Sequence, residues 1–152
     1  MTYVLLSVEL VDDLHNAILN PGELPGRAQD KSLDAALARV DNRLAYGMVN
    51  DIFDLAGAYA VALARGLCFN DGNTRTAFRV MDACLVLNGI TTLWNTEEIG
   101  QIIIRCAQGL MEGGDLADWL RRKAEKDAAA PPPVSRGRAL PYTPASTRIC
   151  RT

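Results

Sequence analysis

Apolar residues recur every three or four positions along most of this chain, a period that predicts amphipathic helices. The first stripe ends before Pro21-Gly22, and a second begins after a connection rich in proline and glycine. The residues that define the two stripes are Leu10, Leu14 and Ile18, followed by Leu33, Leu37, Val40 and Leu44. We therefore expect two helices joined by a loop over residues 21–30, which could form the edge of a site.

The stretch that follows is apolar on nearly every side. Its large residues keep a helical spacing, and Phe53, Ala56 and Ala60 widen the same face. The residues that set this spacing are Leu44, Met48, Ile52, Leu55, Tyr59 and Leu63. A helix that is apolar almost all round is one on which other helices pack. The pattern therefore predicts a central buried helix that runs on from Leu44 and ends near Arg65-Gly66.

Three further elements are expected beyond this helix. One helix should run from about Asn73 to Asn88 and stop at Gly89, and residues 90–94 form a β-prone piece too short to make a sheet alone. Two more helices should begin at caps supplied by Asn95 and Asp115. The residues expected to bury these two helices are Ile99, Ile102, Ile103 and Cys106, then Trp119 and Leu120.

The composition changes at Asp127, where runs of alanine and proline replace the apolar period. Such a segment buries too little apolar surface to fold alone. We therefore predict one compact all-α domain over residues 1–126, with at most a short β-hairpin, and a disordered tail over residues 127–152. A regulatory or partner-binding role for the tail is the alternative to a plain extension.

Composition narrows the class of protein. The chain has 152 residues, 49% of them apolar and 22% charged, which suits one globular domain. Its apolar runs are too short for a membrane span, and its N-terminus does not resemble a signal peptide, so we expect no membrane contact and a cytoplasmic location. The net charge is −2, and the acidic body is a poor nonspecific binder of nucleic acid. The four cysteines lack zinc-ligand spacing and are expected as reduced thiols.

The most informative segment is residues 65–79, which join two apolar helices through a loop with the sequence Asn70-Asp71-Gly72-Asn73. These residues are also common in plain turns. Where such a loop opens a helix, however, it leaves backbone N–H groups free to bind an anion, most naturally phosphate. Asp71 could hold a divalent cation over the same phosphates, and Arg75 could complete the site.

This segment resembles the signature of the Fic/Doc family, which usually reads His-x-Phe-x-Asp/Glu-Gly-Asn-x-Arg. The residues that match it or its Doc variant are Phe69, Asp71, Gly72, Asn73, Arg75, Thr76 and Ala77. Fic enzymes usually carry a second arginine where this chain has Phe78, and Arg79 lies one position late, so the Doc branch is favoured. The resemblance extends over about the first 125 residues and implies the compact all-α fold of that family.

Two positions depart from the family pattern. Leu67 stands where the family has the histidine that acts as general base, and Thr74 stands where Doc proteins have a lysine. Leucine has no proton acceptor, and loss of a general base typically costs about 10²–10⁴ in rate. Threonine can donate a hydrogen bond but cannot supply the positive charge of the lysine.

The resemblance implies a toxin of a toxin–antitoxin pair, which transfers the γ-phosphoryl group of ATP to a threonine of elongation factor Tu and is neutralised by a Phd-like antitoxin. Asp71 would bind Mg²⁺, and Arg75 would hold phosphates together with Phe69, Asn70, Gly72, Asn73 and Arg65. Arg65 could instead cap a helix end. Two alternatives remain open: a catalytically degenerate partner of the antitoxin, and a Fic-type enzyme that transfers AMP.

Two other residues, Cys68 and His15, carry side chains with the chemistry of a base. Cys68 is adjacent to the histidine position, but its apolar neighbours should raise its pKa, so a packing role is favoured. His15 is the only histidine and lies far away in the sequence, in the first predicted helix. We expect it to be solvated or to cap that helix.

Overall fold

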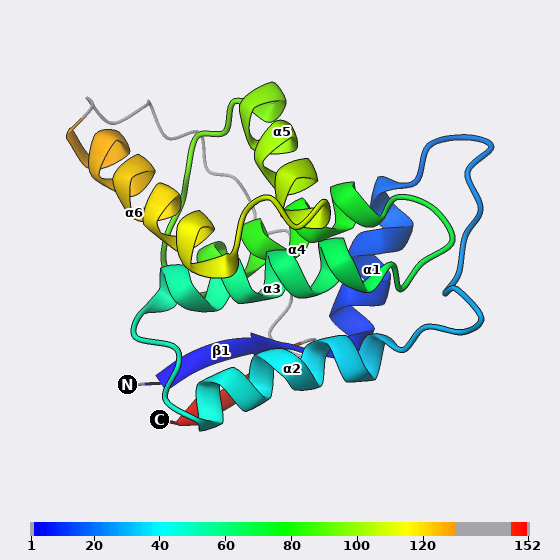
Figure 1. Ribbon diagram of the computed structural model, residues 1–152, viewed down its shortest axis with the longest axis horizontal. Helices are drawn as coiled ribbons and strands as arrows, with labels where there is room; N and C mark the ends of the chain where they lie inside the picture. Colours follow the sequence, from blue (N-terminus) through cyan, green and yellow to red (C-terminus); the bar gives the residue numbers. More distant parts are fainter. Residues whose placement is uncertain (1, 130–146, 152) are drawn as a thin grey trace.

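The computed structural model describes residues 2–129 and 147–151, and in these ranges the chain forms six helices and two short strands (Figure 1). The elements in chain order are β1 (Thr2–Leu6), α1 (Val8–Ile18), α2 (Leu33–Ala45), α3 (Ile52–Gly66), α4 (Asn73–Leu87), α5 (Thr96–Ala107), α6 (Gly113–Ala129) and β2 (Thr147–Arg151). The predicted all-α class is confirmed, since helices form the body of the molecule. No helix in the described ranges is long and apolar enough to cross a membrane.

Helix α3 is the centre of the fold, as predicted. It contacts α2, α4, α5 and α6, and nine of its residues are buried. The predicted continuity from Leu44 is wrong, because α2 ends at Ala45 and α3 begins only at Ile52. Gly47 turns the chain with a φ of 71°, and the Asp51 side chain caps the new helix by accepting from the N–H of Asp54.

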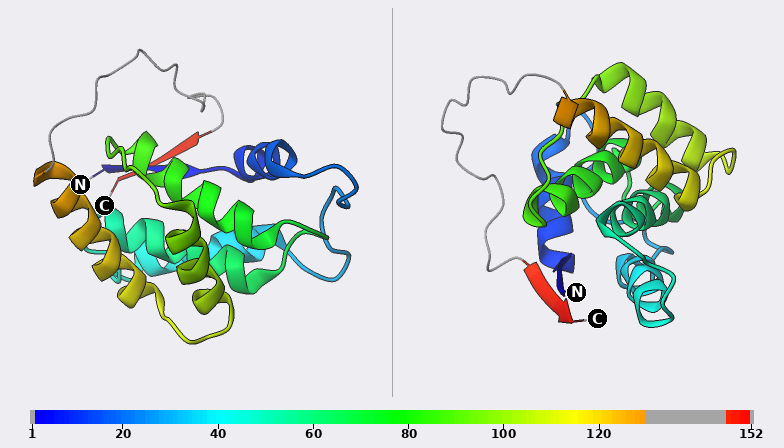
Figure 2. Two further views of the ribbon diagram at one scale, coloured as in Figure 1. Left: turned by 90° about the horizontal axis from the view of Figure 1, so that it is seen from above. Right: turned by 90° about the vertical axis from the view of Figure 1, so that its left-hand side faces the viewer.

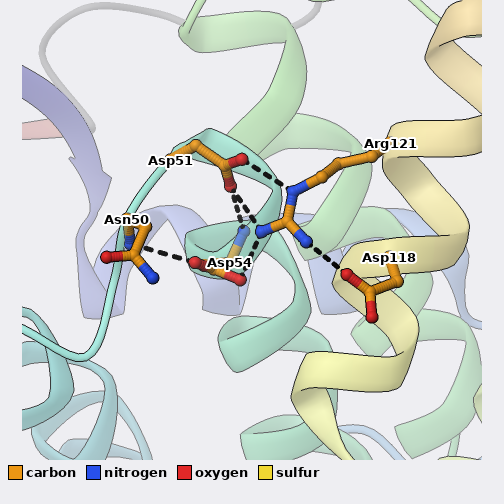
Figure 3. A network of polar contacts seen from close by, with 5 residues as sticks. All are labelled: Asn50, Asp51, Asp54, Asp118 and Arg121. Carbon is orange, nitrogen blue, oxygen red and sulfur yellow. Dashed lines mark hydrogen bonds and ion pairs between the residues drawn. The ribbon is translucent and has the colours of Figure 1, made fainter.

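Helix α6 is held against α3 at two points. Gly57 and Gly113 allow a close approach, because a Cβ placed on Gly57 would lie 2.8 Å from the carbonyl oxygen of Gly113. Farther along, Arg121 donates hydrogen bonds to Asp51 and Asp54 at the start of α3 (Figure 3). The hydrogen bond from Arg121 lowers the pKa of Asp51.

Strand β1 is fixed to the helices by side chains. The amide of Asn88 accepts from the N–H of Val4 at 2.8 Å and donates to its carbonyl at 3.0 Å, in the manner of a neighbouring strand. The hydroxyl of Tyr59 accepts from the N–H of Leu6 at 3.2 Å. Strand β2 pairs antiparallel with β1, from Thr2 opposite Arg151 to Leu6 opposite Thr147 (Figure 2).

The structure differs from the predicted tail at two places. Helix α6 continues to Ala129, beyond the expected boundary at 126, and residues 147–151 form β2. Strand β1 supplies the pairing partner that makes this short stretch extended, which the local sequence does not reveal. The rest of the predicted tail, residues 130–146 and 152, lies outside the described residues.

The segment between α4 and α5 is also different from a strand. Residues 90–95 adopt neither helix nor strand, because no strand in the described part of the chain runs beside them. Instead Trp94 packs edge-on against Phe78 at 5.4 Å between ring centroids and donates to Asp82. The cap expected at Asn95 is confirmed by its bond from the N–H of Glu98.

Candidate functional site

The loop over residues 67–72 joins α3 to α4 at one end of the molecule. A second segment, residues 19–32 between α1 and α2, runs beside it and is called here the covering segment (Figures 1 and 2). The N–H of Ala28 donates to the carbonyl of Cys68 at 2.8 Å, and that of Asn70 donates to the carbonyl of Gly26 at 3.1 Å. The loop predicted over residues 21–30 therefore does lie at the edge of the motif.

Helix α4 opens with a row of unbonded N–H groups. Its first backbone bond runs from Thr76 to the carbonyl of Gly72, and no described residue accepts from the N–H groups of residues 71–75. Gly72 has a φ of 76°, and no side chain caps the helix. The positive φ favours glycine, and a Cβ at Gly72 would lie 3.1 Å from the side chain of Ile18, which would have to shift by a few tenths of an ångström. These groups and the helix dipole favour an anion.

The two asparagines of the motif hold the loop in shape. Asn73 accepts from the N–H of Phe69 at 3.0 Å and donates to its carbonyl at 2.9 Å. Asn70 donates to the carbonyl of Pro25 in the covering segment at 3.0 Å. The side chains of both asparagines are thus used for loop geometry, and the backbone N–H of Asn73 has no acceptor among the described residues.

The two carboxylate oxygens of Asp71 differ in their contacts. One carboxylate oxygen accepts from the N–H of Leu24 at 2.8 Å, while the other has no partner among the described residues. No group of three or more acidic, histidine or cysteine side chains in these ranges could hold a metal ion. A cation at Asp71 would therefore need further oxygen ligands from phosphates or water, which is how Mg²⁺ is usually bound with nucleotides.

Arg75 bonds to α1 and to the covering segment, and its guanidinium lies 3.6 Å from where a Cβ of Gly72 would be. It donates to the carbonyl of Ile18 at 2.9 Å and forms an ion pair with Glu23. The hydrogen bond from Arg75 lowers the pKa of Glu23. An anion at the loop would have to compete with Glu23 for this guanidinium.

The contacts of Arg65 fit the alternative that this residue caps a helix end. Its guanidinium donates to the carbonyls of Cys106 at 2.8 Å and Met111 at 2.9 Å, and it pairs with Glu112. Cys106 lies in the last turn of α5, and Met111 and Glu112 lie in the turn that links α5 to α6. The described contacts therefore use Arg65 to fix that turn.

Leu67 has an unusual backbone. It is the C-cap of α3 in the left-handed region, with a φ of 49° and a ψ of 43°, and it is the one non-glycine residue with positive φ in the described ranges. Its side chain is exposed and offers no proton acceptor. Thr74 is partly buried in the first turn of α4.

Cys68, next along the loop, is buried, and its burial raises the pKa of the thiol. This agrees with the expected packing role.

The expectation for His15 is wrong. The side chain is buried at 1% exposure, and its ring stacks on Phe69 with centroids 3.8 Å apart and planes 9° from parallel. Its Nε2 atom lies 2.7 Å from the carbonyl oxygen of Asp71. Distance along the chain gave no indication that His15 lies beside the motif. Its spacing from Val11 and Ile18 could have predicted burial, because it places all three residues on one helix face.

The covering segment also supplies two groups that the sequence analysis did not identify, Glu23 and the N–H of Leu24. Neither follows a motif. Two hollows, of about 390 and 290 Å³, lie between α1 and α2 and beside β1. The motif loop is instead covered by residues 19–32.

Comparison with known proteins agrees with the motif. The profile of the Fic/DOC family matches residues 5–85, which include α1, α2, α3, the whole loop and most of α4. The chain is also similar to the protein kinase doc of Escherichia phage P1, with 36% identity over 118 residues. That match covers 77% of this chain and 93% of the phage protein.

Proposed function

Because this chain belongs to the Fic/DOC family, we propose that it is a Doc-like toxin of a toxin–antitoxin module. Its family activity is the ATP-dependent phosphorylation of a threonine of elongation factor Tu, which stops translation. In this chain the activity is impaired by the loss of the general base. The row of unbonded N–H groups at the start of α4 is the observation that carries the proposal.

Residues 71–75 bind the phosphates of ATP through their backbone. Gly72 and Asn73 present N–H groups at the positive end of the helix dipole, where they stabilise negative charge without moving. The free carboxylate oxygen of Asp71 is the ligand that the chain offers to Mg²⁺, and a bound Mg²⁺ would neutralise phosphate charge. Arg75 is close enough to assist once Glu23 releases it.

No residue at the loop removes the proton from the target hydroxyl. Leu67 has no acceptor, and His15 is buried with Nε2 engaged by the Asp71 carbonyl. Phosphoryl transfer depends mostly on positioning and charge stabilisation, so a slow reaction remains compatible with this site. We expect a rate about 10²–10⁴ below that of a variant with the base restored.

The loss of the general base is also compatible with a second candidate function. A chain that keeps the fold but lacks the base can still bind a Phd-like antitoxin through its surface, and could then regulate the module without harming the cell. A third, Fic-type transfer of AMP, uses the same kind of loop with the nucleotide reversed. Phe78 is packed against Trp94 and supplies no second arginine, which favours phosphoryl transfer.

The experiment compares the wild-type protein with Leu67→His, Thr74→Lys and the double variant. Each is incubated with Mg²⁺, elongation factor Tu and ATP labelled at either the α- or the γ-phosphate. We expect γ-label on the target with the double variant and little with the wild type. Thr74→Lys is the matched control, because it restores the charge without the base and should stay slow.

Fast γ-labelling by the wild type, equal to that of the double variant, would refute the proposal that the activity of the wild type is impaired. Transfer of α-label would identify the nucleotidyl alternative. Absence of either label with every protein, together with tight binding of a Phd-like antitoxin, would identify the binding partner instead.

A further inference from the structure

His15 contacts the motif loop at two places, although it lies 56 residues away in the chain. Its imidazole stacks face to face on Phe69, and its Nε2 atom lies 2.7 Å from the carbonyl oxygen of Asp71. A carbonyl oxygen can only accept, so Nε2 must carry the proton and donate it. Because the ring is buried, this contact is shielded from water.

The carbonyl of Asp71 and the N–H of Gly72 belong to one peptide group. A trans peptide is planar, and its C=O and N–H bonds point in opposite directions. A hydrogen bond that draws the Asp71 oxygen inward, onto His15, therefore turns the Gly72 N–H outward. That N–H is among the groups at the start of α4 that no described residue accepts from.

We infer that His15 is a positioning residue, which orients the Asp71–Gly72 peptide so that the N–H of Gly72 faces a bound phosphate. This inference rests on the proposed binding of ATP at the loop. His15 itself touches neither the nucleotide nor the target, because its side chain is buried behind the loop. Its stacking on Phe69 fixes the ring, and the donated bond fixes the peptide.

Without the bond from His15, the peptide loses the anchor that sets its direction. Gly72 is a glycine with positive φ, so nothing in its own conformation prevents the peptide from turning over. The turned peptide would aim the carbonyl oxygen of Asp71 at the phosphate, which replaces an attraction by a repulsion. The affinity for phosphates should then fall, while the helices keep their packing.

Two substitutions separate the donated bond from the packing. His15→Phe keeps a buried ring on Phe69 and removes the donor. His15→Gln keeps an N–H donor at the same number of bonds from Cβ and removes the ring. We expect His15→Phe to weaken the affinity for Mg·ATP about tenfold, which is the effect of one oriented donor, and His15→Gln to stay within about threefold of the wild type.

Hydrogen exchange of the free protein gives a readout that needs no nucleotide. The N–H groups of Asn70 and Ala28 join the loop to the covering segment. In His15→Phe they should exchange about tenfold faster, while N–H groups in α3 exchange as in the wild type. In His15→Gln both sets should stay near wild-type rates.

Three results would overturn the inference. The first is that His15→Phe changes neither the affinity for Mg·ATP nor the rates of hydrogen exchange. The second is that exchange of every N–H group in that variant is accelerated equally. The third is that His15→Gln has neither the affinity nor the exchange rates of the wild type. If the wild type does not bind Mg·ATP at all, the proposed function fails. A local change of exchange in His15→Phe, restored in His15→Gln, would then still support the orientation of the peptide by His15.

Discussion

Leu67 combines a missing functional group with an unfavourable backbone. A left-handed conformation costs an L-residue with a Cβ about 1–2 kcal/mol, and Asn, Asp and His tolerate it better than Leu does. The side chain is 52% exposed, so burial recovers little of this cost. The position therefore keeps the backbone geometry of the loop without the chemistry that the family places there.

Leu67→Asn should stabilise the protein by about 1 kcal/mol, because asparagine accepts the left-handed region at lower cost. Chemical denaturation measures the free energy of unfolding. Leu93→Asn is the matched control, since Leu93 is 60% exposed and does not have a positive φ. A gain of the same size in both variants would mean that removal of exposed apolar surface, and not relief of the backbone, is responsible.

Glu23 is the anion already present at Arg75. Glu23→Gln removes its charge and frees the guanidinium for phosphates, so we expect the affinity for Mg·ATP to rise about threefold or more. Isothermal titration calorimetry measures this affinity. Glu112→Gln is the matched control, because Glu112 pairs with Arg65 at the α5–α6 turn. Equal affinities in the wild type and Glu23→Gln would show that Arg75 does not reach the nucleotide.

The packing of α6 on α3 depends on a glycine in the middle of α3. Gly57→Ala should destabilise the fold by about 1–3 kcal/mol, because the new Cβ would meet the backbone of α6 at 2.8 Å. Gly100→Ala in α5 is the control. It meets no atom within 4 Å and should stabilise by roughly 0.5–1 kcal/mol through helix propensity. Thermal unfolding of both variants checks the pair, and stabilisation by Gly57→Ala would contradict the close approach.

The same two helices share the Arg121 network. Arg121→Met removes its bonds to Asp51 and Asp54 and should cost about 1 kcal/mol at pH 7, a modest value because these groups are partly exposed. Arg122→Met, at an exposed neighbour, should change little.

The pH dependence of this contact has a defined sign. The folded pKa of Asp51 is below its ordinary value of 3.8, so its contribution is complete above that value and is lost as the pH falls below it. The deficit of Arg121→Met relative to the wild type should therefore shrink below about pH 4. A deficit that is constant with pH would mean that packing, and not the ion pairs, is lost.

Elements with strong local signals were predictable. The apolar period, the cap at Asn95 and the stop at Gly89 are set by neighbouring residues, and the structure has each of them. The helix start predicted at Asp115 is wrong, because α6 begins at Gly113 and Asp115 lies in its first turn, where its side chain accepts from the N–H of Glu112. The break between α2 and α3 was missed, because Met48 continues the period although its side chain is exposed. Periodicity alone cannot tell an exposed apolar residue of a loop from a buried one of a helix.

Across the whole molecule, the unpredicted parts are those made by contacts distant in sequence. Strand β1 is defined by Asn88 and by β2, and the environment of His15 is created by a loop 56 residues away. The motif itself was visible because its residues are contiguous. The ion pair of Arg75 with Glu23 was not, because no pattern in the sequence pairs a glutamate with an arginine 52 residues later.

The central claim is that this loop binds a magnesium nucleotide although its base is gone. The most direct test is isothermal titration calorimetry of Mg·ATP into the wild type and Asp71→Asn, with Asp13→Asn on the exposed face of α1 as control. Asparagine keeps an oxygen for the N–H of Leu24 and removes the charge that binds Mg²⁺. We predict binding by the wild type and by Asp13→Asn, and at least tenfold weaker binding by Asp71→Asn. No binding by the wild type, or equal binding by all three, would contradict the account.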